Sequence, residues 1–294
     1  MKLFEQTSFN ISEQVTKSYS TSFYSATRFF DAESRQAIFS IYGFVRFADE
    51  IVDTFHQYDK ATLLQKFEND YYDAIKQGIS LNPVLHSFQI TVKKYCITDD
   101  LVQAFLRSMK YDLEKTEYTN RAEIDDYIFG SADVVGLMCL KVFCNGNDSQ
   151  YQELKHAAMK LGSAFQKVNF LRDLKNDVEN LGRSYFPNLG KNSFDEHTKN
   201  LIIQEIQNDF DDAYKGIQQL PKNAKLPVLI AYTYYLELLH KIKQTPAERI
   251  MTDRIRVSNF QKTLLIGNAY LLYFRHRFEP KQLFFGLNPI KQVL

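Results

Sequence analysis

Apolar residues recur at intervals of three and four positions along nearly the whole chain, and sustained alternation of the strand type is almost absent. This spacing predicts an all-α fold, because side chains three and four positions apart share one face of a helix. We expect helices over residues 10–17, 31–55, 60–77, 82–95, 98–114, 121–143, 149–180, 194–218, 223–244 and 247–274.

Local signals mark several of these helix ends. Asp31 and Thr98 are suited to N-cap positions, and Gly78 follows the third helix where a C-cap belongs. No Ser- or Gly-rich linker divides the 294 residues, so we expect a single domain over residues 1–294.

The composition argues against several classes of protein. A net charge of +1 without a basic stripe gives little basis for binding nucleic acid, and we expect no such partner. The three cysteines show no CxxC spacing, which argues against a disulfide framework or a zinc site and fits a cytoplasmic protein. The longest apolar stretch, residues 226–239, is short and contains Pro227 and Glu237, so we expect no membrane span.

A polar stripe runs along the predicted helix 149–180. At 100° per residue, Gln166, Asn169, Asp173 and Asp177 fall within one quadrant, with apolar residues on both sides. Such a stripe faces the protein interior. Buried carboxylates are costly unless they are paired or bound to a cation, so both aspartates need compensation.

A second acidic stripe lies on the predicted helix 31–55. Tyr42, Arg46, Asp49 and Asp53 follow one another at four, three and four positions along one face. One reading is that nearby arginines neutralise these carboxylates in ordinary ion pairs. The other is that two facing acidic stripes share Mg²⁺ and hold a diphosphate, with Arg183 as a further clamp. An allylic diphosphate would then ionise in a water-poor apolar cavity.

Hydroxyl side chains crowd the segment YSTSFY at residues 19–24. A capped turn accounts for them, since Ser and Thr favour turns and caps. Alternatively, Ser20 and Ser22 donate hydrogen bonds to an anionic ligand.

Taken together, these motifs resemble one known family. YSTSF, the YxxxRxxDExxD pattern from Tyr42, the QxxNxxRDxxxD pattern from Gln166 and the GRSYFP that follows are similar to the squalene/phytoene synthases, and among these to the bacterial phytoene synthases. The resemblance covers nearly the whole chain. It implies a single-domain isoprenoid-synthase-type helical bundle around a central cavity, with two aspartate-rich motifs on opposite walls.

The resemblance also implies roles for individual residues. The metal ligands would be Asp49, Asp53, Asp173 and Asp177. The catalytic residues would be Tyr42, Arg46, Arg172 and Tyr235. The substrate-binding residues would be Ser20, Ser22, Gln166, Asn169, Arg183 and Arg254.

The implied reaction is the Mg²⁺-dependent head-to-head condensation of two geranylgeranyl diphosphates to phytoene through a cyclopropyl diphosphate. Mn²⁺ is a substitute metal, and no NADPH is expected for phytoene. A close alternative uses farnesyl diphosphate to make dehydrosqualene or, with NADPH, squalene. A non-catalytic assembly protein of the same fold is an alternative of another class. A chain-elongating prenyltransferase or terpene cyclase fits the motifs less well.

Two further expectations follow from the resemblance. Asp133 stands where relatives often have glycine, which leaves the local helix break and the cavity shape open. A long hydrocarbon product predicts peripheral contact with a membrane, for which residues 275–285 are a candidate; the alternative is that this tail closes the bundle. The sequence does not indicate an oligomeric state.

Overall fold

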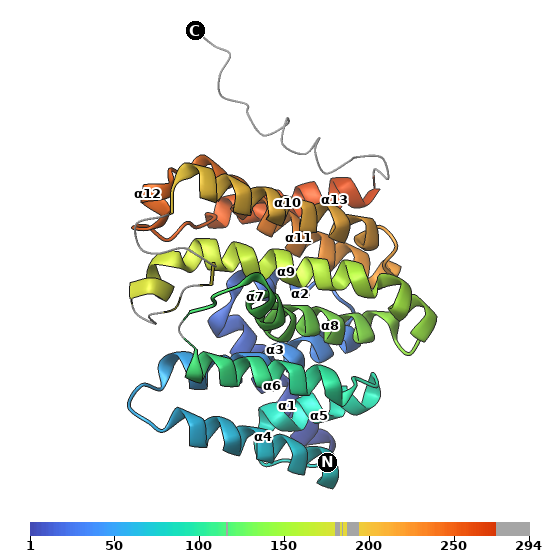
Figure 1. Ribbon diagram of the computed structural model, residues 1–294. Helices are drawn as coiled ribbons and strands as arrows, with labels where there is room; N and C mark the ends of the chain where they lie inside the picture. Colours follow the sequence, from blue (N-terminus) through green and yellow to red (C-terminus); the bar gives the residue numbers. More distant parts are fainter. Residues whose placement is uncertain (116, 180–182, 184, 187–193, 275–294) are drawn as a thin grey trace.

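The computed structural model describes residues 1–115, 117–179, 183, 185–186 and 194–274. Every element of regular secondary structure in these ranges is a helix (Figure 1). The all-α prediction is therefore confirmed. The first helices are α1 Lys2–Tyr19, α2 Thr21–Thr27, α3 Ala32–Thr54, α4 Lys60–Gln77, α5 Pro83–Lys94, α6 Asp99–Glu114 and α7 Arg121–Ile128. They are followed by the π-helical turn η1 Phe129–Asp133, α8 Val134–Cys144, α9 Asp148–Glu179, α10 Glu196–Ile217, α11 Lys222–Gln244, α12 Ala247–Ile250 and α13 Asn259–Phe274.

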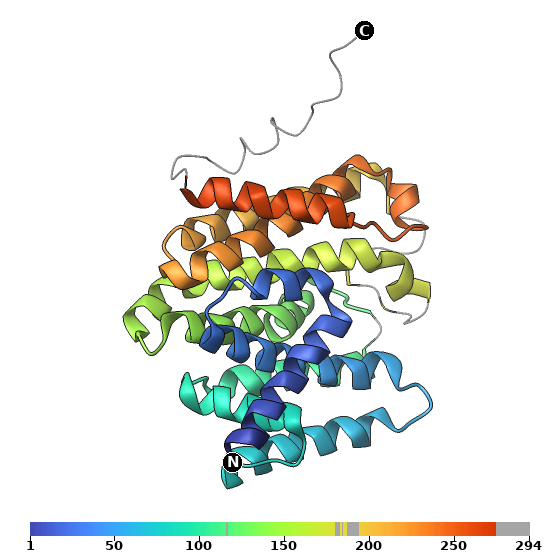
Figure 2. The ribbon, with the colours of Figure 1, turned by 180° about the vertical axis from the view of Figure 1, so that it is seen from behind.

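The helices stack in layers around α9, which is the longest of them at 32 residues (Figures 1 and 2). On one side α9 packs against α10 and α11, and α13 lies outside α11. On the other side it packs against η1 and α8, which in turn contact α3 and α6. The layer farthest from α13 contains α4 and α5, and α1 runs from this layer to α2 in the middle of the bundle. Consequently α3 and α9 lie on either side of the central space.

Capping explains why several predicted ends are accurate. α4 matches the predicted range, since Asp59 accepts a hydrogen bond from the Thr62 amide at 3.0 Å and Gly78 ends the helix with φ of 76°. Asp31 caps α3 as predicted, by accepting a hydrogen bond from the Ser34 amide at 2.9 Å. Thr98 occupies the N-cap of α6 but makes no side-chain cap bond.

Two predicted segments differ from the structure. At the N-terminus a helix begins at Lys2, and YSTSFY is not a simple turn: Ser20 separates two helices and accepts a hydrogen bond from the Phe23 amide at 3.3 Å. Near the C-terminus the predicted helix 247–274 is two helices, with residues 251–258 between them. Val257 of this connection is buried, so a core contact interrupts the helix that periodicity alone predicts.

Small residues allow η1 to approach α9 closely. A Cβ on Gly162 would lie 2.7 Å from the Ala132 carbonyl oxygen, which is closer than atoms can pack. Asp133 ends η1 without breaking the helical run, and its carboxylate accepts a hydrogen bond from Ser163 Oγ at 3.0 Å. Its side chain does not line the cavity described below. The Asp133 side chain therefore contributes to the contact with α9 and not to the cavity wall.

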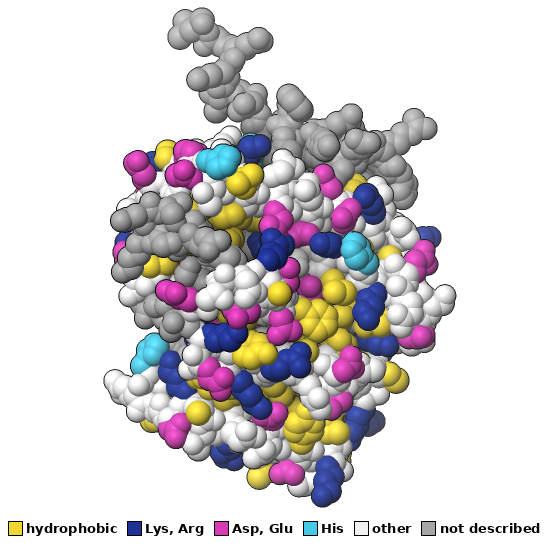
Figure 3. Space-filling model, viewed as in Figure 1, with side chains coloured by type: hydrophobic (Ala, Val, Ile, Leu, Met, Phe, Trp, Pro, Cys, Tyr) yellow, Lys and Arg dark blue, Asp and Glu magenta, His cyan; other side chains and the backbone are white. Residues whose placement is uncertain are grey.

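The run Arg121–Cys144, which comprises α7, η1 and α8, is long and apolar enough to cross a membrane, and 61% of its most apolar window is buried inside the bundle. The sequence prediction of no membrane span was based on residues 226–239 and did not consider this run. Packing of η1 and α8 against α6 and α9 accounts for its apolar composition. On the described part of the face shown in Figure 3, basic and acidic side chains are interspersed without a large patch of one sign.

Candidate active site

A cavity of about 590 Å³ is lined by residues of α1, α2, α3, α6, α7, η1, α8, α9, α10 and α11. Most of its charged lining residues interact with one another, as in the pairs of Arg183 with Asp53 and of Arg254 with Asp173, and form one pole, whereas much of the remaining wall is apolar. The apolar lining includes Phe30, Ile38, Leu140, Phe143, Leu154, Ile217 and Val228. This combination suits a molecule with a charged head and a long hydrocarbon tail.

The two acidic stripes meet at the polar pole. Asp49 and Asp53 come from α3, and Asp173 and Asp177 come from α9. Burial raises the pKa of Asp49 to about 7, and repulsion from Asp53 adds to the shift. Burial, Asp173 and Asp53 likewise raise the pKa of Asp177 to about 7. Both stripes line the cavity, and Arg183 connects them: its Nη1 donates a hydrogen bond to Asp53 at 2.8 Å, and its backbone amide donates one to the Asp177 carbonyl oxygen at 2.8 Å.

Arginines partly neutralise the aspartates of the two stripes. Arg183 Nη1 donates a hydrogen bond to Asp53 at 2.8 Å, and Arg254 Nε lies 2.7 Å from Asp173. Arg172 also pairs with Asp173. The ion-pair interpretation, in which Arg46 and Arg172 neutralise neighbouring carboxylates, holds for Arg172 with Asp173. Asp53 instead pairs with the distant Arg183, and the arginine pairs in the described part of the chain do not include Asp49 or Asp177.

Arg46 does not pair with the aspartates of its own stripe. Its guanidinium forms an ion pair with Glu50, one turn later on α3. The same group lies 4.5 Å from the centre of the Tyr19 ring, in cation–π geometry. Arg46 nevertheless lines the cavity, and its buried Nε has no hydrogen-bond partner among the described residues.

The four aspartates fit a metal that completes its coordination from a substrate. No three His, Cys, Asp or Glu side chains in the described ranges converge as a protein-only metal cage. Mg²⁺ does not require one, because it commonly takes one or two carboxylates together with water and phosphate oxygens. Recessed carboxylates with raised pKa values, repelling one another, are the donors that such a cation would stabilise.

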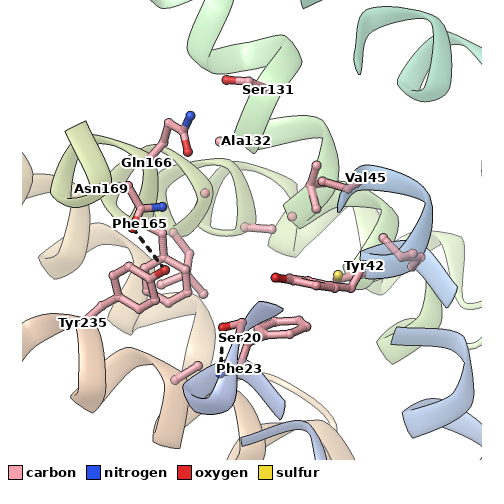
Figure 4. A pocket seen from close by; sticks show the side chains of 18 of the residues that line it. Ser20, Phe23, Tyr42, Val45, Ser131, Ala132, Phe165, Gln166, Asn169 and Tyr235 are labelled. Atoms are coloured by element: carbon pink, nitrogen blue, oxygen red, sulfur yellow. Dashed lines mark hydrogen bonds between the residues drawn. The ribbon is translucent and has the colours of Figure 1, made fainter. Parts of the chain in front are cut away.

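A polar and aromatic wall adjoins the acidic pole (Figure 4). Tyr235 Oη donates a hydrogen bond to Asn169 Oδ1 at 3.3 Å, and its ring stacks on Phe165 with the centroids 3.9 Å apart. Tyr42 and Ser20 lie across the same space, where burial raises the pKa of Tyr42 to about 12. The Tyr42 hydroxyl is therefore protonated and can act as a donor.

The structure brings nearly all predicted site residues together. The lining residues among them are Ser20, Tyr42, Arg46, Asp49, Asp53, Gln166, Asn169, Arg172, Asp173, Asp177, Arg183, Tyr235 and Arg254. Ser22 is the exception: it lies on α2 but not in the cavity wall. The rest of the GRSYFP motif is only partly described, because residues 182, 184 and 187 lie outside the described ranges, as do residues 275–285.

Sequence reasoning missed Asp112 on α6 and Tyr127 on α7, both of which line the cavity. Tyr127 Oη donates a hydrogen bond to Asp112 Oδ2 at 2.9 Å, and Arg183 Nη2 donates to the Asp112 carbonyl oxygen at 2.9 Å. Burial raises the pKa of Asp112 to about 7. The sequence does contain a signal for Asp112. This residue follows Phe105 and Ser108 at helical spacing, and both of these lie on the buried face of α6.

Sequence comparison identifies the family. A profile described as squalene/phytoene synthase matches residues 16–190, which is more than half of the chain, and the chain therefore belongs to the squalene/phytoene synthase family. Phytoene synthase 1 of Zea mays is 26% identical over 275 residues, covering 87% of this chain and 66% of the maize protein. Phytoene synthase of Arthrospira platensis is 26% identical over 291 residues, covering 90% and 93%. The chain thus spans just under two thirds of the length of the maize relative.

Solved structures show the same architecture. A dehydrosqualene synthase in complex with a ligand superposes with a TM-score of 0.78 at 19% identity, covering 91% of this chain and 96% of that chain. Squalene synthase HpnC from Alicyclobacillus acidocaldarius gives a TM-score of 0.71 at 20% identity, covering 82% and 94%. The expected isoprenoid-synthase helical fold is confirmed.

Proposed function

We propose that the protein condenses two geranylgeranyl diphosphates head to head, forming phytoene. The observation that carries this proposal is the meeting of two acidic helix faces, from α3 and α9, at the polar pole of an otherwise apolar cavity. Membership of the squalene/phytoene synthase family supports the reaction class, and relatives named phytoene synthase support the longer substrate.

The first step is loss of diphosphate from one substrate. The allylic C1–O bond breaks, the diphosphate leaves with the electron pair, and C1 becomes a cation. Arg172, Arg183 and Arg254 are anchored on carboxylates at this pole, and their remaining N–H groups can bind phosphate oxygens. Mg²⁺, or Mn²⁺ in its place, would be held by the four aspartates and would supply charge neutralisation to the leaving group.

The cation must then be protected from water. Phe23, Phe165 and Tyr235 line the wall beside the polar pole, and an aromatic face stabilises a cation by roughly 0.5 to 2 kcal/mol. A double bond of the second substrate attacks C1, and loss of a proton closes the cyclopropyl ring. The second diphosphate leaves in the same way, and a second proton is lost as phytoene forms. No reductant is consumed, so the reaction needs no NADPH.

Hydrocarbon analysis tests this proposal. The purified protein is incubated with geranylgeranyl or farnesyl diphosphate and Mg²⁺, with and without NADPH. We expect a C40 hydrocarbon from geranylgeranyl diphosphate in both conditions. A C30 hydrocarbon from farnesyl diphosphate and none from the longer substrate would show that the phytoene assignment is wrong. Absence of diphosphate release from both substrates would favour the non-catalytic assembly protein.

A further inference from the structure

Glu50 stands between Asp49 and Asp53 in the sequence, but unlike them it does not line the cavity. Successive residues on a helix point about 100° apart, so Glu50 is turned away from the direction of Asp49. Its side chain is 18% exposed, and its carboxylate binds the guanidinium of Arg46, one turn earlier on α3. The diphosphate chemistry described above makes no use of this carboxylate.

Arg46 has two carboxylates within reach on its own helix. Asp49 follows it by three positions and Glu50 by four, and both spacings bring side chains together on a helix. Burial and Asp53 raise the pKa of Asp49 to about 7, and the charge of Arg46 opposes that shift, so these groups interact electrostatically. The guanidinium nevertheless pairs with Glu50, and no arginine pair among the described residues includes Asp49. Glu50 therefore competes successfully with Asp49 for this cation.

A second contact supports the same orientation of Arg46. Tyr19, the last residue of α1, has its ring centroid 4.5 Å from the Arg46 Cζ. A guanidinium binds a carboxylate through its N–H groups and an aromatic ring through its flat face, so the two contacts are compatible. Together they restrict the guanidinium to the orientation in which it binds Glu50.

We propose that Glu50 is a positioning residue: by binding Arg46, it keeps the guanidinium from pairing with Asp49 and leaves that carboxylate free for a divalent cation. The proposal rests on the proposed function, in which Asp49 is a metal ligand. Without the Glu50 charge, the carboxylate nearest to Arg46 along α3 is Asp49. An ion pair there would occupy a ligand that the metal needs, so the metal would bind more weakly.

Mn²⁺ binding to the full chain tests the proposal without turnover. Electron paramagnetic resonance of free Mn²⁺ gives the dissociation constant for the parent and for Glu50→Gln, which keeps the shape of the side chain and removes its charge. We expect Mn²⁺ to bind this variant about tenfold more weakly, a loss typical for residues that support a metal ligand. Glu68→Gln is the matched control and should bind as the parent does, since Glu68 is 15% exposed, pairs with Lys110 and does not line the cavity.

A second background distinguishes positioning from the simple loss of a negative charge. In Arg46→Gln no guanidinium is available to pair with Asp49. Adding Glu50→Gln to this background should therefore weaken Mn²⁺ binding by less than about twofold, because the two substitutions are coupled. A long-range charge effect would instead lower the affinity by the same factor in both backgrounds.

The proposal is overturned if the parent does not bind Mn²⁺, if Glu50→Gln binds it as tightly as the parent, or if the loss is equal in the Arg46→Gln background or in Glu68→Gln. Diphosphate release separates this proposal from the proposed function. In an active parent, Glu50→Gln should raise the Mg²⁺ concentration for half-maximal release by about the same factor. A parent that shows the expected Mn²⁺ binding pattern but releases no diphosphate from either prenyl substrate contradicts only the proposed function.

Discussion

Arg183 Nη1 donates a 2.8 Å hydrogen bond to Asp53 Oδ1, although 130 positions separate the two residues. The same guanidinium donates through Nη2 to the Asp112 carbonyl oxygen on α6 at 2.9 Å. Its side chain is only 7% exposed. One arginine from the segment after α9 therefore connects α3 to α6 at the polar pole, and its planar fork is needed for both contacts.

Replacing Arg183 with Lys should lower Mg²⁺-dependent diphosphate release about 10- to 100-fold, because an ammonium keeps the charge but cannot hold both partners in the same geometry. Steady-state assay of diphosphate measures the effect. Arg121→Lys is the matched control: Arg121 also bridges two partners, Asp125 and Glu205, but it is 59% exposed and does not line the cavity. Similar losses in both variants would contradict the role assigned to Arg183.

Asp49→Asn and Asp173→Asn should each reduce diphosphate release about 100-fold or more, because each removes a charge from one of the two facing walls. The Mg²⁺ concentration needed for half-maximal release should also rise. Asp70→Asn serves as control, since the Asp70 side chain is 40% exposed and pairs with Lys66 on α4, and it does not line the cavity. Unchanged turnover and metal dependence in both wall variants would eliminate the proposed metal site.

Two glycine substitutions should have opposite effects on stability. Gly162→Ala forces a Cβ against the Ala132 carbonyl and should lower the free energy of unfolding by about 1 to 3 kcal/mol. Gly267→Ala meets nothing within 4 Å and should raise it by up to about 1 kcal/mol, because alanine favours the helix. Urea denaturation of both variants measures the difference; equal destabilisation would mean that the η1–α9 contact is not as close as described.

Asp133 should make the protein less stable as the pH rises. Burial raises its folded-state pKa to about 7 from an ordinary value of 3.8, despite the hydrogen bond from Ser163 and the charge of Lys167. The folded state therefore binds more protons between these two pH values, and the free energy of unfolding falls across that interval. Asp133→Asn should remove this contribution and add on the order of 1 to 3 kcal/mol at pH 8, with little change at pH 4.

Denaturation of the parent and of Asp133→Asn at pH 4, 6 and 8 checks this expectation. Lys160 and Asp209 also act on the Asp133 carboxyl, and both remain in the variant. If the two proteins differed by the same free energy at all three pH values, titration of Asp133 would not be the cause.

The sequence predicted the helix limits best where capping residues stand at both ends of the helix. α4 lies between Asp59 and Gly78, so its limits depend on neighbouring residues alone. The two acidic stripes were also predictable, because residues four positions apart on a helix must share a face. Their meeting across one cavity depended on the family resemblance, since spacing within one helix contains no information about its partner.

Other features arise only from tertiary contacts. The π-helical turn at Phe129–Asp133 places the chain against α9, and nothing in its local sequence specifies the extra residue per turn. Asp112 looked like one of many charged helix residues until its burial beside Arg183 was known. The break at residues 251–258 brings Arg254 to Asp173, a long-range pairing that periodicity could not predict.

The contact between Arg254 and Asp173 has a consequence for the synthesis of the protein. The polar pole gathers side chains from Ser20 near the start of the chain to Arg254 near its end. During synthesis the four aspartates of α3 and α9 are translated before Arg254, so any pocket formed by the shorter chain would lack one of its cations. Products truncated before residue 254 therefore lack one of the cations of the polar pole.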